Sequence, residues 1–414
     1  MTNAAIWIIA FLSIAGVITR PFKVPEAVWA SGGACLLILC ALISPFEGLA
    51  GFLKGTDVYL FLTGMMLLAE TAREEKLFDW LACHATKMAG GSSKKLFLLI
   101  YLVGIFVTIF LSNDATAVVL TPAVIAVATA AKIKNPLPFL FICAFVANAA
   151  SFVLPISNPA NLVIYQSKMP PLFLWLKQYL LPSICAITVT YIMLYFTQKK
   201  QLNQNINSAI LIPKLSISGI TALWGIGIAA VVLLGASAMN IQLGLPTAIT
   251  GILTSAVVLI KAKKTPWVIL KGVSWSVLAL VAGLFIIVQG LDKTGMIQSL
   301  AQLLNRSLEN SINATVWKSS LIVAFACNLL NNLPSGLIVG NILQVSQVPE
   351  IIKSAVLIGI DLGPNLSVTG SLATILWLVA LRRDGIKVTA WSFLKPGILI
   401  MFVALIFTIA SLLL

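Results

Sequence analysis

Two short polar islands interrupt long apolar stretches, one in each half of the chain. Their members are Ser112, Asn113 and Asp114 in the first half, and Asn331 and Asn332 in the second. An Asn or Asp side chain in hydrocarbon costs free energy unless a partner satisfies it. Amides, a hydroxyl and a carboxylate at matched points of two halves predict a polar site between inverted repeats in the middle of a membrane. This pattern is typical of a transporter.

Two further breaks follow the islands, PISNPAN (155–161) and DLGPNLSVTGS (361–371). Proline removes an amide donor and glycine loosens the backbone, so a helix should unwind at each break. We expect a helix N-cap at each of these four places. In the two breaks the caps are Asn158, which precedes Pro159, and Ser371. In the two islands they are a residue of Ser112–Asp114 and, in the second half, Asn332 with Pro334. Four helix N-termini would then converge, which favours oxygen-rich or anionic ligands, while unwound carbonyls beside them could instead hold Na+.

The composition identifies the environment of these residues. Hydrophobic residues make up 59% of the chain, charged residues only 10%, and the mean hydropathy is +1.02. A soluble chain carries about a quarter charged residues. Apolar runs of roughly 16–20 residues recur along the sequence, long enough to span or nearly span a bilayer. We therefore predict an all-α integral membrane protein, with residues 4–19 as a first span rather than a cleaved signal peptide, because no basic region precedes them.

The distribution of basic residues predicts the topology. The net charge of +14 comes from 27 Lys and Arg, most of them in short loops, as expected of cytoplasmic loops rather than of a nucleic-acid partner. Twenty of the 27 Lys and Arg residues lie together on the cytoplasmic side of the membrane only if residues 96–131 and 319–347 form re-entrant hairpins. Each half then has five spans and one hairpin, ten spans and two hairpins in all, and both termini are periplasmic. Twelve simple spans remain the alternative, because hydropathy alone does not reject them.

We divide the chain accordingly into two inverted repeats. Residues 1–200 form the first repeat, with a broken helix at 137–167. Residues 201–216 are a cytoplasmic linker. Residues 217–414 form the second repeat, with a broken helix at 351–381. Since five spans is an odd number, the second repeat has the opposite orientation in the membrane.

Four segments of the chain resemble the bacterial ArsB arsenite/antimonite efflux permeases. They are FLSNDATAVVLTPAV, PISNPANLVIY, NNLPSGLIVG and GIDLGPNLSVTGSLATILWLVALRRDG. The resemblance covers nearly the whole chain, and DLGPN with GSLATILW is its most specific part. It implies an elevator-type fold in the bacterial inner membrane. It also implies export of trivalent arsenic and antimony from the cytoplasm, driven by proton exchange or by an associated soluble ATPase.

The same superfamily leaves an alternative function open. It contains Na+/H+ antiporters and Na+-coupled anion or dicarboxylate carriers, which share the first polar island loosely. A membrane enzyme or scaffold is a third class, but the chain shows no nucleophile–base constellation and no phosphate-binding GxxxxGK[ST] loop. The six cysteines include no CxxC pair and His84 is the only histidine, so we expect neither a metal site nor a cofactor.

Physical chemistry narrows the roles of the polar residues. Arsenous acid is neutral near pH 7 and carries three hydroxyls, which amides, hydroxyls and helix-end N–H groups can match by hydrogen bonding. The residues predicted to contact the substrate are Asn113, Ser157, Asn158, Asn161, Asn332, Asn365, Thr369 and Ser371. Secondary candidates are Ser112, Thr116, Asn331, Ser335 and Cys327.

Asp114 and Asp361 are the candidate proton carriers. Loss of solvation disfavours a charged carboxylate, so each acid can alternate between its protonated and ionised forms. For each residue the alternative is an acid that only caps a helix end. Glu70 is expected to pair with Arg73 at a helix end.

Thiol ligation is the alternative to hydrogen bonding of the cargo. Trivalent arsenic prefers thiolates, but a site of three thiolates would retain the cargo rather than release it. We therefore expect hydrogen bonds to hold the substrate and the cysteines to be dispensable. Among the cysteines, Cys327 is the best placed, about one turn before Asn331.

Overall fold

The computed structural model describes residues 2–207, 210 and 212–414, and its regular structure is helical. The helices of the first half are α1 (Thr2–Thr19), α2 (Glu26–Leu39), α3 (Pro45–Lys54), α4 (Thr56–Glu74), α5 (Leu77–Ala89), α6 (Ser93–Leu111), α7 (Asn113–Ala115), α8 (Thr121–Ala130), α9 (Leu137–Ala149), α10 (Pro159–Tyr165) and α11 (Leu172–Gln198). Those of the second half are α12 (Ile217–Ala238), α13 (Gly244–Ala262), α14 (Trp267–Leu270), α15 (Ser276–Lys293), α16 (Met296–Asn310), α17 (Ile312–Leu330), α18 (Asn332–Ser346), α19 (Glu350–Leu362), α20 (Leu372–Arg383) and α21 (Ala390–Leu412).

Equivalent helices begin and end at matched positions of the two halves. Helices α6 and α17 each contain 19 residues and start at positions 93 and 312. Their N-caps also correspond: Ser92 and Ser311 each accept a hydrogen bond from the backbone N–H three residues later. Helices α9 and α19 have 13 residues each and start at positions 137 and 350. The helices and the breaks between them therefore follow one another in the same order in both halves, as the sequence predicts.

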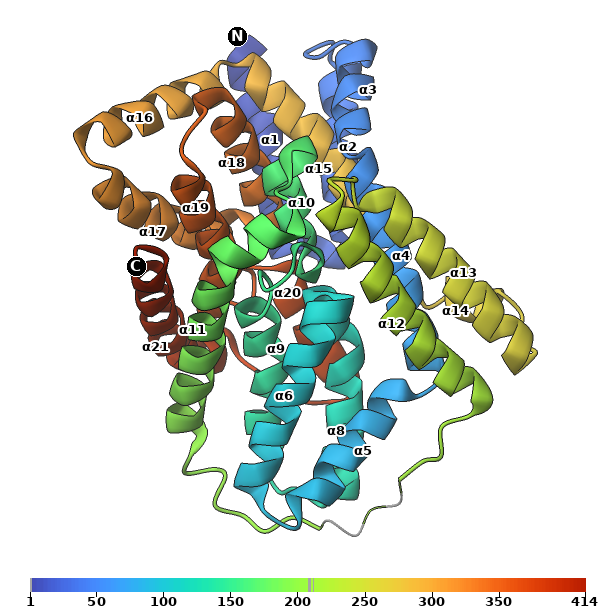
Figure 1. Cartoon of the computed structure of the whole chain (residues 1–414). Helices are drawn as coiled ribbons and strands as arrows, with labels where there is room; N and C mark the ends of the chain where they lie inside the picture. Colours follow the sequence, from blue (N-terminus) through green and yellow to red (C-terminus); the bar gives the residue numbers. More distant parts are fainter. Residues whose placement is uncertain (1, 208–209, 211) are drawn as a thin grey trace.

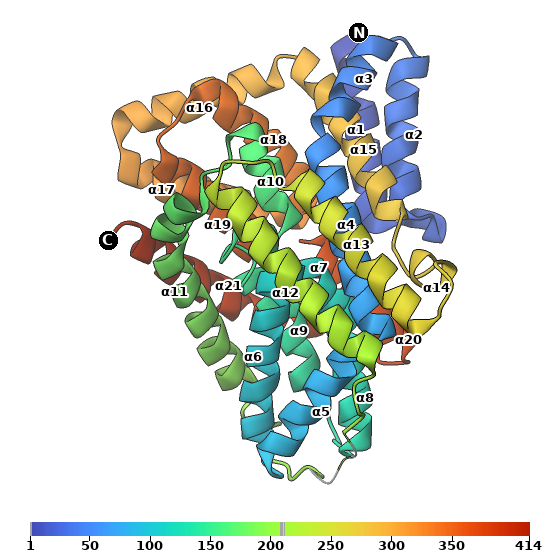
Figure 2. The ribbon, with the colours of Figure 1, turned by 45° about the vertical axis from the view of Figure 1, so that its right-hand side comes forward.

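The two hairpins enter from opposite ends of the molecule. Helices α6 and α8 reach from the lower end to the middle, where α7 lies at the turn, whereas α16, α17 and α18 occupy the other side (Figures 1 and 2). Within the described residues, nine helices are long and apolar enough to cross a membrane. Because α6, the 113–130 arm and α17 are among these nine, length alone does not separate hairpin arms from spans.

The turns of both hairpins have the same backbone geometry. Ser112 and Asn331 follow the first arms with φ values of 91° and 72°, and each caps the second arm. The cap of the second hairpin is thus Asn331, one residue before the predicted Asn332. Asn331 can fill both roles because Asn tolerates positive φ and its side chain accepts from the N–H two residues on. Residues Thr116–Leu120 in the first return arm are π-helical, which the sequence did not indicate.

Outer helices of each half pack against helices of the other half. Helix α4 packs against α13, and its counterpart α15 packs against α2. Gly64 allows the first close approach, since a Cβ there would overlap the backbone of Thr247, and Gly283 allows the second beside Ala30. The repeats are therefore interlocked rather than placed side by side.

The linker between α11 and α12 runs beneath the first hairpin (Figure 1). The N–H of Ile206 donates to the carbonyl of Gly91, and the N–H of Asn207 donates to that of Ala131. Of the predicted linker 201–216, positions 208, 209 and 211 lie outside the described residues, as does position 1 of the first predicted repeat.

Candidate functional site

A crossed pair of polar contacts joins the two broken helices. Asn158 Nδ2 donates to Asp361 Oδ1 at 2.7 Å, and Ser371 Oγ donates to Asn148 Oδ1 at 3.4 Å. When α9 is aligned with α19, Asn148 and Asp361 occupy equivalent positions. The same alignment makes the cap Asn158 equivalent to the cap Ser371. All four side chains are buried. The polar centre is therefore built from both repeats at once.

The caps predicted at the two broken helices are present. Asn158 Oδ1 accepts from the N–H of Ala160 at 3.0 Å, which starts α10. Ser371 Oγ accepts from the N–H of Thr374 at 3.1 Å, which starts α20. These short helices therefore direct their N-terminal dipole ends into the polar centre.

Each hairpin turn is fastened to the break of its own repeat. In the first repeat, Ser157 Oγ donates to the carbonyl of Ile109 at 3.1 Å. In the second, Asn331 Nδ2 donates to the carbonyl of Thr369 at 3.1 Å, and the N–H of Asn332 donates to that of Gly370 at 2.9 Å. The hairpin tips and breaks thus form one contiguous unit.

Several buried polar atoms in this unit have no protein partner within the described part of the chain. They are Asn113 Oδ1, Asn161 Oδ1, Asn332 Oδ1, Ser335 Oγ, Asp361 Oδ2 and Asn365 Nδ2. A buried polar atom is normally hydrogen-bonded, so such a concentration indicates that water or a ligand completes the bonding. All six atoms belong to residues that the sequence singled out.

Other predicted contact residues are occupied by the protein itself. Ser157 and Ser371 hold the local backbone as described above, and Thr369 Oγ1 donates to the carbonyl of Asn328 at 3.3 Å. Asn161 Nδ2 donates to the carbonyl of Ser151 at 2.9 Å, which leaves only its oxygen free. These side chains shape the site more directly than they present groups to a ligand.

Two residues of the site escaped the sequence analysis. Asn148 Nδ2 donates to Asn365 Oδ1 at 2.9 Å. Asn328 Oδ1 accepts from Ser367 Oγ at 2.6 Å, and its Nδ2 donates to the carbonyl of Gly363 at 2.9 Å. Alignment of the two repeats places Asn148 opposite Asp361, and that correspondence was the available signal.

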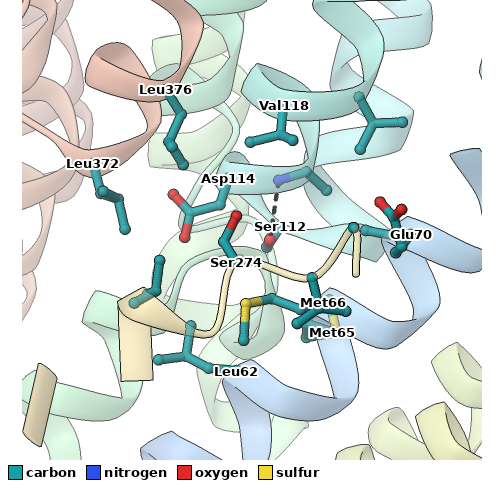
Figure 3. A pocket seen from close by; sticks show the side chains of 16 residues that line it. Leu62, Met65, Met66, Glu70, Ser112, Asp114, Val118, Ser274, Leu372 and Leu376 are labelled. Carbon is teal, nitrogen blue, oxygen red and sulfur yellow. Dashed lines mark hydrogen bonds between the residues drawn. The ribbon is translucent and has the colours of Figure 1, made fainter. Parts of the chain in front are cut away.

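The Asp114 side chain, on the first hairpin tip, lines a cavity of about 60 Å³ (Figure 3). The cavity separates the first hairpin tip and α20 from α4 and the loop before α15, and Leu62, Met65 and Leu372 line it. Asp114 and Ser112 face the cavity, and the Asp114 carboxyl group has no hydrogen-bond partner among the described residues. The space is sufficient for several water molecules or one small solute.

Glu70 lies at the edge of the same cavity and pairs with Arg73, as predicted. Arg73 Nε donates to Glu70 Oε2 at 2.8 Å. The backbone of Gly272 covers this carboxylate, because a Cβ at that position would overlap it. No cluster of three metal-binding side chains occurs in the residues that the structure describes.

The arrangement defines an integral membrane transporter built from two inverted repeats with re-entrant hairpins. Two solved transporters share the fold over nearly their whole length. The Alcanivorax borkumensis YdaH transporter gives a TM-score of 0.58 at 12% identity and covers 99% of this chain and 97% of its own. Neisseria gonorrhoeae MtrF, described with a class of antimetabolite efflux pumps, gives 0.59 at 14% identity and covers 100% and 94%.

Residues 8–359 match the family model of the citrate transporters, CitMHS, and the chain belongs to this family. Among its relatives, the arsenical pump membrane protein of Escherichia coli K12 is 28% identical over 360 residues, 82% of each chain. A putative arsenical pump membrane protein of Bacillus subtilis is 23% identical over 97% of each chain. The resemblance to arsenical efflux permeases is thereby confirmed, and the chain is a multi-pass membrane transporter.

Proposed function

We propose that this transporter exports trivalent arsenic and antimony from the cytoplasm as neutral hydroxides in exchange for protons. One observation carries the proposal: the buried centre holds unpartnered amide, hydroxyl and carboxyl atoms, and no Lys or Arg belongs to it among the described residues. A trihydroxide can both donate to and accept from such groups. The names of the arsenical pump relatives support the same substrate.

The charges of the site favour a neutral substrate over an anion. Ionised Asp361 in the cluster and ionised Asp114 in the cavity would both repel a carboxylate or phosphate. Citrate remains the second candidate, because the family is described by it and the helix N-termini of α10 and α20 could hold a carboxylate. A Na+-coupled carrier of that kind would depend on Na+, whereas the proposed exporter would not.

Two carboxyl groups are available to couple protons to transport. Asp361 accepts from Asn158 through one oxygen, while its second oxygen is unpartnered within the described residues and can carry a proton. Asp114 faces a cavity large enough for water, and water there can exchange a proton with its carboxyl group. In this scheme protonation and cargo binding alternate, and each passage of the cargo outward returns a proton inward.

Flux in everted membrane vesicles tests the proposal. Vesicles containing the protein should accumulate radiolabelled antimonite or arsenite when the lumen is acidified. Uptake should ignore Na+, citrate should not compete, and a protonophore should abolish the gradient-driven component. Na+-dependent citrate flux without metalloid flux would refute the proposal. Uptake that survives the protonophore but needs ATP would assign the energy to a soluble ATPase partner.

The inner membrane of bacteria is the proposed location, with both termini in the periplasm. The distribution of Lys and Arg in the loops supports this orientation. Cargo would then enter from the face on which the linker lies and leave from the face of α16.

A further inference from the structure

The two hairpins are closed by different chemistry at equivalent positions. In the first hairpin, Thr108 Oγ1 of α6 and Thr116 Oγ1 of the return arm are hydrogen-bonded at 2.8 Å. When α17 is aligned on α6, the equivalent residues are Cys327 of α17 and Ser335 of α18. The second hairpin thus carries a thiol and a hydroxyl where the first carries two bonded hydroxyls.

The thiol of Cys327 lies among unsatisfied oxygen atoms. Its Sγ makes a weak 3.8 Å contact to the carbonyl of Ile360, and Ser335 and Asp361 lie beside it. Ser335 Oγ and Asp361 Oδ2 have no hydrogen-bond partner among the described residues, although both side chains are 1% exposed. A thiol facing a hydroxyl, a pair that forms at most a weak hydrogen bond, therefore stands where two hydroxyls close the first hairpin, and the two buried oxygen atoms keep bonding capacity for a ligand.

A third difference between the repeats falls at the same place. The residue equivalent to Asp361 in the first repeat is Asn148, so a carboxyl group replaces an amide next to the thiol. Hairpin closure alone gives no reason for three coincident changes, because Thr108 and Thr116 already close a hairpin of the same geometry. Together the changes supply one soft sulfur ligand, one hydroxyl and one group that can accept and return a proton.

We propose that Cys327 forms a single, reversible sulfur bond to the trivalent metalloid during transport, and this inference rests on the proposed function. Arsenic loses one hydroxide and gains the sulfur: the As–O bond breaks, the As–S bond forms, and the thiol proton leaves with the hydroxide as water. Arsenic stays trivalent, so no oxidant or reductant is needed. In this proposal the carboxyl group of Asp361, which lies beside the thiol, carries the proton from sulfur to the departing hydroxyl.

One sulfur bond is compatible with release of the cargo, whereas three would retain it. Water reverses the step by attacking arsenic while the proton returns to sulfur. This proposal departs from the expectation that all six cysteines are dispensable: it predicts that transport requires Cys327 and none of the other five. The bond would also make the site selective for the metalloid over citrate, because citrate has no hydroxide ligand that a thiol can replace.

X-ray absorption at the arsenic edge tests the proposal in the purified wild-type protein loaded with arsenite. The expected first shell is one sulfur and two oxygens. Cys327→Thr reproduces the residue found at position 108, so it should fold. It should lose the sulfur signal and lower the rate of arsenite and antimonite uptake by about tenfold or more.

Cys143→Val is the matched control, since Cys143 is equally buried and the equivalent residue of α19 is Val356. It should retain both the sulfur signal and the flux. A wild-type spectrum with oxygen neighbours alone, or full flux in Cys327→Thr, would overturn the role of Cys327. Either result would leave the proposed export intact, whereas absence of metalloid flux in the wild type would remove that function itself. If Cys327→Thr does not reach the membrane, a variant that keeps Cys327 as its single cysteine decides the question, because any sulfur neighbour of arsenic then comes from Cys327.

Discussion

Asp361 occupies in the second repeat the position that Asn148 occupies in the first, and each side chain contacts the cap of the opposite broken helix. The contacts are Asn158 to Asp361 at 2.7 Å and Ser371 to Asn148 at 3.4 Å. The site is therefore nearly symmetric in construction and asymmetric in charge. Only the second repeat places a titratable group at this crossing point, which is why we propose Asp361 as a proton carrier.

Replacing Asp361 with asparagine should separate binding from coupling. Asp361→Asn makes the two repeats alike at this position, so the fold should survive, and metalloid should still bind. The variant cannot release a proton, so uptake driven by a pH gradient should fall by about tenfold or more. Exposed Asp384→Asn serves as the control and should transport normally. Wild-type gradient-driven flux in Asp361→Asn, at equal expression, would limit Asp361 to a structural role.

Asp114→Asn tests the second acid in the same way. The amide keeps the size of the side chain but removes its charge from the cavity between α4 and the first hairpin. If Asp114 carries protons, exchange of metalloid between two compartments of equal pH should persist while gradient-driven uptake is lost. Loss of both activities would show instead that Asp114 contacts the cargo, and retention of both would show that it does neither. Measuring the two activities in the same vesicles distinguishes these results.

Labelling of introduced cysteines tests the orientation. Ser92→Cys and Asn203→Cys should place a cytoplasmic thiol that an impermeant maleimide added to intact cells does not reach. Ala238→Cys and Asn310→Cys should place a periplasmic thiol that is labelled. The background should be a variant that lacks the exposed native Cys35 and Cys40. Labelling of Asn203→Cys from outside would contradict the proposed arrangement of ten spans and two hairpins.

Glu75, at the C-terminal end of α4, should stabilise the contacts of α4 with the start of α12 and the end of α13 in a pH-dependent manner. Burial opposes its ionisation, but hydrogen bonds from Ser218, Lys264 and Ser216 outweigh this effect and hold the pKa of Glu75 below its ordinary value of 4.5. The stabilisation is thus complete above pH 4.5 and disappears as the pH falls through the lower pKa of the folded protein.

Thermal unfolding of Glu75→Gln in detergent should show this dependence. The variant should have a lower Tm than the wild type at pH 7, and the difference should shrink below pH 4.5. A constant difference across this range would mean that Glu75 acts through packing rather than charge. Exposed Glu309→Gln provides the control.

Gly64 should not tolerate a side chain. A Cβ at this position would overlap the backbone of Thr247 where α4 meets α13, so Gly64→Ala must push the two helices apart. We expect a loss of about 1–3 kcal/mol in the free energy of unfolding, read as a lower melting temperature and poorer expression. Gly227→Ala, on α12 with open space around its Cα, should have little effect. Equal stability of the two variants would contradict the close approach.

The amino-acid sequence by itself determined the membrane environment and the repeat, and it singled out most of the polar residues that form the candidate site. Hydropathy and loop charge are local properties, so they can be read without a structure. The polar residues at 112–114, 155–161, 331–332 and 361–371 stood out because polar groups in apolar runs are costly. Caps such as Asn158 and Ser371 followed from residue type and the adjoining helix.

Only the tertiary structure decided which of those residues meet and which are already occupied. Asn158 contacts Asp361 across 203 positions of the chain, and no local pattern predicts such a pairing. The structure also placed Asp114 in a cavity beside α4, engaged Ser157 and Thr369 in local hydrogen bonds, and brought Ser335 and Asp361 next to Cys327. The physical reason is that hydrogen-bond satisfaction depends on the exact position of every neighbour, whereas spans and breaks depend on composition along a single segment.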